Sequence, residues 1–314
     1  MQCRESSPLT TGQTNAWFMC PNCNALQTIP DRALDGYFWH TSKPCPSCGS
    51  PIDWWVAFRR LLEGGSSFSM FSAVRAHQTV VQTGLRRGEI LELDFEQLGL
   101  PKNARLLHIN YTPNGHGLAP VEMHGNEPQR YQIPRRVSLY PVPKAGAETN
   151  EVPLAILYTW VETAVDDVAW DSLVDAFEAF SSGRFSALVV PANVAVESRV
   201  SRVLHKFLCK TVPVNRVEDF LRSAATYSYQ FNVLLPVLVD AFGAPHMPDD
   251  LRGHLNHLRK TRNDLAHRGR FDKPLSVGDA ANLLCAAVFG FEYCQIVGEV
   301  LEVSGVPKAA RGPA

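Results

Sequence analysis

The chain has 314 residues, of which 45% are hydrophobic and 19% charged, and its formal net charge at pH 7 is −1. This composition is typical of a soluble globular protein, and it excludes a disordered chain and a nucleic-acid binder that is basic over its whole surface. A chain of this length is expected to divide into two or three domains.

No segment of the chain predicts secretion or membrane insertion. Residues 1–8 contain no apolar stretch of the kind found in a signal peptide. The most apolar runs, 231–244 and 283–291, are too short to cross a bilayer or are interrupted by Pro236 and Asp240. We therefore expect a cytoplasmic protein with no membrane segment, in which cysteines stay reduced and bind metal more readily than they form disulfides.

The first expected domain, residues 1–65, carries two C-x-x-C pairs separated by 21 residues, namely Cys20, Cys23, Cys45 and Cys48. This is the spacing of a structural zinc site, in which two short turns direct four thiolates at one ion. All four positions are filled by protein ligands, which leaves none open for catalysis. Asn24 and Gly49 follow the two turns, and both residue types tolerate the positive φ that such turns require.

The segment between the two pairs, residues 36–41, is rich in aromatic residues and predicts a strand, so that the unit resembles a zinc ribbon. A short helix capped by Asp53 is expected to follow and to end at Gly64. Its apolar residues share one side and are expected to form core, with base stacking as the alternative: Trp54, Trp55, Phe58, Leu61 and Leu62. The pattern does not distinguish a ribbon that binds nucleic acid from one that docks a protein or only stabilises the fold.

Residues 66–165 are expected to form a β-rich domain, a sandwich or a barrel. Short alternating or β-branched runs, separated by turn sequences, lie at 77–83, 90–95, 105–112, 121–124, 137–142 and 154–161. Three histidines in this domain, His108, His116 and His124, have no spacing that indicates a metal site. The position of the domain suggests a sensor for a ligand or a partner.

Residues 166–305 change to helical periodicity and predict a helical bundle, followed by a tail at 306–314. The expected helices cover 168–180, 191–209, 216–224, 227–242, 251–268 and 277–303. The whole chain is thus predicted to be a multidomain α+β protein with a zinc ribbon, a β-rich middle and a C-terminal helical bundle.

The helix over 251–268 carries the most informative residues. A helical wheel places Leu251, Leu255, Leu258 and Leu265 on one apolar stripe, with Arg262 near its centre. A cation at such a position needs a partner. His267 lies in the last turn, before Gly269, a residue typical of the position after a helix end.

The run Arg262-Asn263-Asp264-Leu265-Ala266-His267 resembles the motif of the HEPN superfamily, an arginine followed after four to six residues by a histidine, with a polar residue after the arginine. Arg252 and His257 repeat the spacing in the same helix, but Gly253 follows that arginine in place of a polar residue. The resemblance covers a predicted helical domain over about 166–303, and its specific part is six residues long.

The resemblance implies a metal-independent endoribonuclease that acts as a homodimer and leaves 2′,3′-cyclic phosphate and 5′-hydroxyl ends. Arg262, Asn263 and His267 would then be catalytic. Four neighbouring cations would bind flanking RNA phosphates without reading sequence: Arg259, Lys260, Arg268 and Arg270. Members of the superfamily also include toxins and anti-phage effectors, so a regulatory or antitoxin partner is a further expectation.

Two other functions remain open at this stage. A HEPN-like domain can bind nucleic acid or a protein partner without catalysis, and would then serve as the dimerising part of a regulatory protein. In the third interpretation the match at Arg262 is accidental and the chain is a structural interaction protein. RNA cleavage distinguishes the first function from the others, and RNA retention distinguishes the second from the third.

Overall fold

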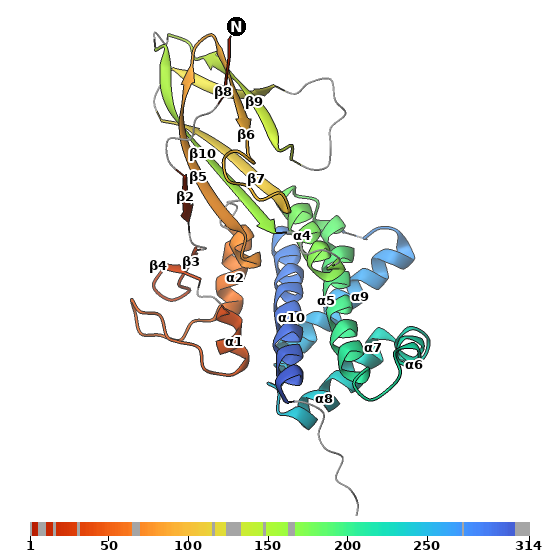
Figure 1. The fold of residues 1–314 in the computed structure, drawn as a ribbon. Coiled ribbons are helices and arrows are strands. Elements are labelled where there is room, and N and C mark those ends of the chain that lie inside the picture. The colour runs from red at the N-terminus through yellow and green to blue at the C-terminus, as the bar shows by residue number, and fades with distance from the viewer. Residues whose placement is uncertain are drawn as a thin grey trace, which may run out of the picture. The chain divides into compact units, whose positions relative to one another are not determined.

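A computed structural model describes residues 2–5, 11–14, 17–29, 32–64, 70–114, 117–123, 133–146, 149–162, 167–271 and 273–304. The chain forms two compact units, and each unit is built from two separate stretches of sequence (Figure 1). Residues 1–17 and 66–165 form the β unit, and residues 18–65 and 166–314 form the helical unit. The expected tail at 306–314, His116 and His124 lie outside the described residues.

The β unit contains two four-stranded sheets. The first has the strand order β1-β6-β9-β8 and the second β2-β5-β10-β7. All pairs are antiparallel except β1 with β6. The strands are β1 (Gln2–Glu5), β2 (Thr11–Thr14), β5 (His77–Arg86), β6 (Glu89–Asp94), β7 (Ala104–Pro113), β8 (Leu118–Met123), β9 (Arg136–Pro143) and β10 (Glu151–Glu162).

One apolar core joins the two sheets, so the β unit is a sandwich. Alternate residues of both sheets contribute to this core, among them Val81, Ile156, Leu91 and Leu139. All six strands expected in this region are confirmed. The short strands β1 and β2 were not expected, because polar residues at the start of a chain carry no strand pattern of their own and pair only where a sheet edge receives them.

His108, on β7, gives the sandwich a testable response to acid. Burial lowers the pKa of its imidazole below the usual value of 6.5. The unfolded chain therefore takes up the proton more readily, so the stability that depends on neutral His108 is complete above about pH 6.5 and is lost as the pH falls towards the lowered pKa. We expect the urea midpoint of the wild type to drop more between about pH 7.5 and about pH 5.5 than that of His108→Gln. Equal drops of the urea midpoint in the two proteins would show that His108 does not contribute to the loss of stability in acid.

The helical unit begins with the cysteine-bearing segment, which contains β3 (Trp17–Met19), β4 (Leu26–Thr28), α1 (Ala33–Phe38) and α2 (Trp54–Glu63). The strand expected at 36–41 is wrong, because α1 occupies this part of the chain. Leu34 and Phe38, four residues apart, are both buried, and this spacing serves a helix packed on another helix better than a strand. The paired strands β3 and β4 flank the first cysteine pair instead.

Helix α2 agrees with its prediction. The carboxylate of Asp53 accepts a hydrogen bond from the backbone N–H of Val56 at 3.0 Å, and the helix ends at Gly64. Four of the five apolar residues expected in the core are buried: Trp54, Phe58, Leu61 and Leu62. Trp55 is half-buried.

The bundle contains α4 (Val168–Ser181), α5 (Phe185–Leu208), α6 (Val214–Asp219), α7 (Tyr227–Tyr229), α8 (Leu235–Phe242), α9 (Asp249–Arg268) and α10 (Val277–Ser304). Two π-helical turns, Phe220–Ala224 and Gln230–Leu234, extend α6 and connect α7 to α8. Helix α5 begins six residues before the expected start at Pro191, which lies inside it. Burial of Leu188 and Val189 offsets the backbone hydrogen bond that a proline cannot donate.

Helix α10 runs through the helical unit and contacts α2, α4, α5 and α9. Within the described residues it is long and apolar enough, by length and composition, to span a membrane, with a mean hydropathy of 1.5. Its most apolar stretch is 72% buried, as in the core helix of a globular bundle. The helix expected over 277–303 is thus confirmed, and its apolar part is longer than the run 283–291.

Gly290, on α10, is closely packed against α9 and α5. A Cβ at this position would lie 2.8 Å from Leu255 Cδ2 and 3.2 Å from Val196 Cγ1. Gly290→Ala is therefore expected to lower the free energy of unfolding by about 1–3 kcal/mol, because the packed neighbours must shift. Gly253→Ala, at an exposed position of α9, is the matched control: a Cβ there meets nothing within 4 Å, and we expect a gain of about 0.5–1 kcal/mol in the free energy of unfolding. The free energies of unfolding of both variants, measured by denaturant titration, test this expectation. An unchanged value for Gly290→Ala would contradict the close packing at this position.

Candidate functional site

The four cysteines of the two C-x-x-C pairs lie together. Their Sγ atoms are all within 4.8 Å of one another, with 4.0 Å between Cys20 and Cys48 and 3.9 Å between Cys23 and Cys45. A tetrahedral ion with Zn–S bonds of about 2.3 Å separates its sulfurs by about 3.8 Å. The donor set and its geometry therefore fit one thiolate-bound metal ion with no open position.

The two turns that carry these cysteines have the same backbone hydrogen bonds. The N–H of Asn24 donates to the carbonyl of Cys20, and the N–H of Gly49 donates to the carbonyl of Cys45, at 2.9 and 2.8 Å. Asn24 and Gly49 have φ of 59° and 71°, so the predicted left-handed positions are confirmed. The repeat directs two thiols from each turn towards a common point.

Backbone donors favour the thiolate at two of these positions. The N–H groups of Cys23 and Asn22 lower the pKa of the Cys20 thiol to about 7. The N–H and the hydroxyl of Ser50 lower the pKa of Cys48. At Cys23, by contrast, the Ala25 backbone lowers the pKa but burial and the neighbouring cysteines raise it to about 11, so local donors favour the metal-binding thiolate at Cys20 and Cys48 only.

Aromatic contacts join the cysteine-bearing segment to the bundle. On α1, the Tyr37 ring lies 5.3 Å from that of Phe289, and the Phe38 ring lies 5.2 Å from that of Tyr293, both on α10. On α2, the Trp55 indole stacks on the His254 imidazole of α9, with centroids 4.3 Å apart and planes at 16°. The cysteine-bearing segment thus contacts, through aromatic side chains, both α10 and α9, the helix that carries the R-x4-H motif.

On α9 the buried stripe differs in one residue from the expected one. Leu251, Leu255 and Leu258 are buried, but Thr261 completes the stripe and Leu265 is only half-buried. Helix α9 ends soon after Leu265, and the residues of its last turn, 266–268, are exposed. Arg262 consequently lies at the border of the stripe and is half-buried rather than central.

The guanidinium of Arg262 is held by its neighbour. Its Nη1 donates a hydrogen bond to Oδ1 of Asn263 at 3.1 Å. Among the residues that the structure describes, no carboxylate lies within ion-pairing distance of Arg262. The remaining N–H groups of a half-buried arginine are therefore available to an anion from outside this chain.

His267 lies in the last turn of α9, immediately before the end at Gly269, which has φ of 69°. Its side chain is exposed. No hydrogen bond joins His267 to Arg262 in the described part of the chain. Within one chain, the two residues thus lie near the same end of the helix without contacting each other through a hydrogen bond.

The four predicted phosphate-binding cations also lie on or just after α9. Lys260, Arg268 and Arg270 are exposed, and Arg259 is half-buried. The Nε of Arg259 is buried without an acceptor in the described structure.

Sequence reasoning did not identify Tyr227 as a neighbour of this helix. Burial raises the pKa of its phenol, the charge of Glu197 raises it further, and the charge of Arg259 lowers it. These three residues come from α7, α5 and α9. Glu197 also accepts a hydrogen bond from Asn193 at 3.1 Å. No sequence pattern could have indicated this grouping, because the three residues are brought together only by the packing of three helices.

Comparisons of the chain with models of known protein families, with curated proteins and with solved structures give no match. The resemblance to the HEPN motif therefore depends on the residues of α9 and their surroundings alone.

Proposed function

We propose that this protein is a metal-independent endoribonuclease of the HEPN type, which acts as a homodimer. The observation that carries the proposal is the environment of Arg262. Its half-buried guanidinium is oriented by Asn263 and has no carboxylate partner among the described residues. The exposed His267 follows it by about one and a half turns, at the end of the helix. An arginine in this position has the planar donors and the permanent charge to bind a phosphate.

The chemistry assigns a role to each residue. In RNA cleavage by transesterification, the ribose 2′-hydroxyl loses a proton and attacks the adjacent phosphorus, while the 5′-oxygen leaves and gains a proton. Arg262 would stabilise the charge that gathers on the phosphorane oxygens, and Asn263 would hold Arg262 in place. The products are a 2′,3′-cyclic phosphate and a 5′-hydroxyl.

A dimer supplies both a base and an acid. One imidazole cannot remove a proton and deliver another within a single concerted step, whereas two copies of His267 from two protomers can. Exposure of His267 at the helix end leaves it free to approach a partner's site. Arg259, Lys260, Arg268 and Arg270 would hold flanking phosphates, with affinity that falls as salt rises.

For the cysteine cluster we propose structural zinc, held by Cys20, Cys23, Cys45 and Cys48. Four sulfur ligands favour zinc, and a closed four-ligand site gives stability rather than catalysis. In this proposal the protein is a cytoplasmic toxin or anti-phage effector. The zinc ribbon and the β unit would control or target it, and a regulatory or antitoxin partner would restrain it.

The experiment is incubation of zinc-loaded protein with total RNA and with tRNA, without added magnesium, and mapping of the product ends. A parallel reaction in EDTA needs a check that the fold survives loss of zinc. Cleavage to cyclic phosphate ends without magnesium would support the proposal. Retention of RNA on immobilised protein without cleavage of any substrate would instead favour the nucleic-acid-binding alternative.

A further inference from the structure

Arg259 projects from the same face of α9 as the motif residues. On a helical wheel of about 100° per residue, Arg262 lies about 60° to one side of Arg259 and His267 about 80° to the other side. Arg268 projects from the opposite side of the helix, about 180° away, and Lys260 is exposed. Arg259 therefore lies between the directions of the two motif residues, about one turn before Arg262.

The guanidinium of Arg259 is partly buried and lacks an acceptor. Its Nε is buried without a hydrogen-bond partner in the described structure. Burial raises the pKa of the Tyr227 phenol and the charge of Arg259 opposes this rise, which shows that the two side chains are close. Within the described part of the chain, Arg259 forms no ion pair with Glu197, which instead accepts a hydrogen bond from Asn193 at 3.1 Å. A buried donor without an acceptor is unfavourable and indicates a partner from outside the chain.

Arg259 and Arg262 thus place two uncompensated positive charges on adjacent turns. Side chains three residues apart on a helix are neighbours, with Cβ atoms about 5–6 Å apart, and like charges at this spacing repel each other. The sequence from 251 to 268 has one carboxylate, Asp264, which projects about 140° away from Arg259. The next residue on the arginine face is the small, exposed Ala266, so the face is open beside Arg262. An anion that binds here relieves the repulsion and accepts hydrogen bonds from both arginines.

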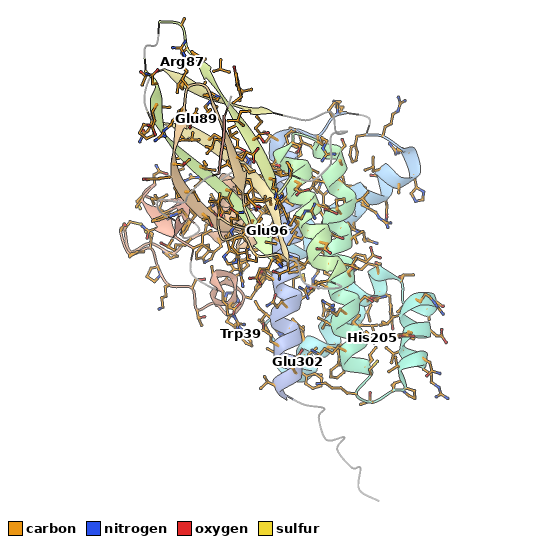
Figure 2. The ribbon with its side chains drawn as sticks, turned by 45° about the horizontal axis from the view of Figure 1, so that its top comes forward. Trp39, Arg87, Glu89, Glu96, His205 and Glu302 are labelled. Carbon is orange, nitrogen blue, oxygen red and sulfur yellow. The ribbon has the colours of Figure 1, made fainter. Side chains whose placement is uncertain are left out.

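Elsewhere in the helical unit, a cavity with a cationic wall does not offer such a site. It has a volume of about 780 Å³ and lies between the C-terminal ends of α5 and α10, where Figure 2 labels His205 and Glu302. Its permanent cations are paired within the chain: Arg199 and Arg202 with Asp167, Lys206 with Glu302, and Lys210 with the carbonyl of Leu301. An incoming anion therefore meets uncompensated charge on α9 rather than in this cavity.

We propose that Arg259 and Arg262 bind one phosphate group between them, so that Arg259 is a second arginine of the scissile-phosphate site rather than a flanking contact. This inference rests on the proposed ribonuclease function. The planar donors of two guanidinium groups match the several oxygens of a phosphate. During cleavage the second arginine shares the charge that develops on the phosphorane oxygens, while the proton transfers remain with His267.

The first test follows the Nε–H signals of arginine side chains in a proton–nitrogen correlation spectrum of full-length zinc-loaded protein. The buried Nε–H of Arg259 is expected to exchange slowly with water and to give a signal, which Arg259→Lys identifies by removing it. We expect this signal to shift, and the shift to saturate, as inorganic phosphate is added at constant ionic strength. A signal that does not respond to phosphate would overturn the proposal.

Arg262→Lys tests whether the two arginines share the anion, and it leaves Arg259 in place. The lysine keeps the positive charge but loses the parallel donors. We therefore expect the Kd of phosphate, read from the Arg259 signal, to rise about tenfold. Arg252→Lys is the matched control, because Arg252 lies on the same face but about 10.5 Å further along the axis, and the Kd should stay within about twofold of the wild type. An unchanged Kd in Arg262→Lys would contradict a shared site.

RNA cleavage separates this inference from the proposed function. We expect Arg259→Lys, once its unfolding curve matches the wild type, to lower kcat by about 10²-fold, whereas loss of a flanking contact raises KM and leaves kcat unchanged. If the wild type cleaves no RNA but the phosphate titrations behave as expected, the two-arginine site stands and the ribonuclease does not. If the wild type cleaves RNA and Arg259→Lys keeps its kcat, the ribonuclease stands and this inference is wrong.

Discussion

Replacement of His267 by alanine is expected to lower the rate of RNA cleavage by about 10²–10⁴-fold, the range that general acid–base catalysis contributes. His267 is exposed at the end of α9 and packs against no core, so the variant should keep the stability of the wild type. Single-turnover cleavage rates and thermal unfolding of the same preparations test this expectation together.

Arg262→Ala is expected to cost about 10²–10³-fold in the same assay, because a group that stabilises developing charge is lost. Arg262→Lys should recover only part of the loss, since an ammonium group cannot present two parallel donors to a phosphate. As Arg262 is half-buried, unfolding curves must show that its variants remain folded before their rates are interpreted.

The same helix offers a matched control. Arg252 and His257 have the spacing of Arg262 and His267, but Arg252 has no polar residue after it and His257 is far from the helix end. Arg252→Ala and His257→Ala should therefore leave the cleavage rate within about a factor of a few of the wild type. If they lose as much activity as the motif variants, the general charge of α9 and not the motif is what matters.

A mixed dimer tests the need for two histidines. When one protomer carries His267→Ala and its partner is wild type, we expect activity close to that of the double variant, because either the base or the acid is missing at each site. Half of the wild-type rate would instead show that each protomer works alone. Differently tagged chains, purified through both tags, provide the sample.

Removal of the metal is expected to destabilise the whole helical unit, not only the cysteine turns. Structural zinc contributes about 10–16 kcal/mol of apparent binding free energy in small zinc domains, and this energy is folding energy. Here the two cysteine-bearing turns lie at the two ends of the segment that contains α1, and α1 packs on α10 through Tyr37 and Phe38. Loss of the ion thus frees a surface of the central helix.

The measurement is thermal unfolding, followed by helical circular dichroism, of zinc-loaded protein, chelated protein and Cys45→Ser. We expect one zinc per chain, and a fall in the melting temperature of the helices when the zinc or the buried Cys45 thiolate is lost. Cys209→Ser, which alters a cysteine outside the cluster, is the control and should melt like the wild type. An unchanged helical transition after complete loss of zinc would show that the cluster is independent of the bundle.

Local chemistry made several features predictable. The two C-x-x-C pairs predicted one four-cysteine cluster because a two-residue gap has few ways to place two thiols. Asn24 and Gly49 predicted left-handed turns, Asp53 predicted a helix start, and Gly269 predicted a helix end, since each is decided by backbone preferences within a few residues. Six strands of the sandwich followed from alternation or from β-branched residues within each run, whereas β1 and β2 did not.

Only the tertiary structure decided the features that depend on distant residues. The aromatic segment before Thr41 is helical because Phe38 packs against Tyr293, and no local pattern contains that partner. The cysteine turns belong with a bundle that begins about a hundred residues later. Arg262 proved half-buried, because the burial of a residue is set by helices that meet it from elsewhere. The sequence by itself determined the turns, the helix caps and the residue types of the cysteine cluster and of the α9 motif. Packing decided how deeply these residues are buried and what surrounds them, because local preferences act over a few residues whereas burial depends on the whole chain.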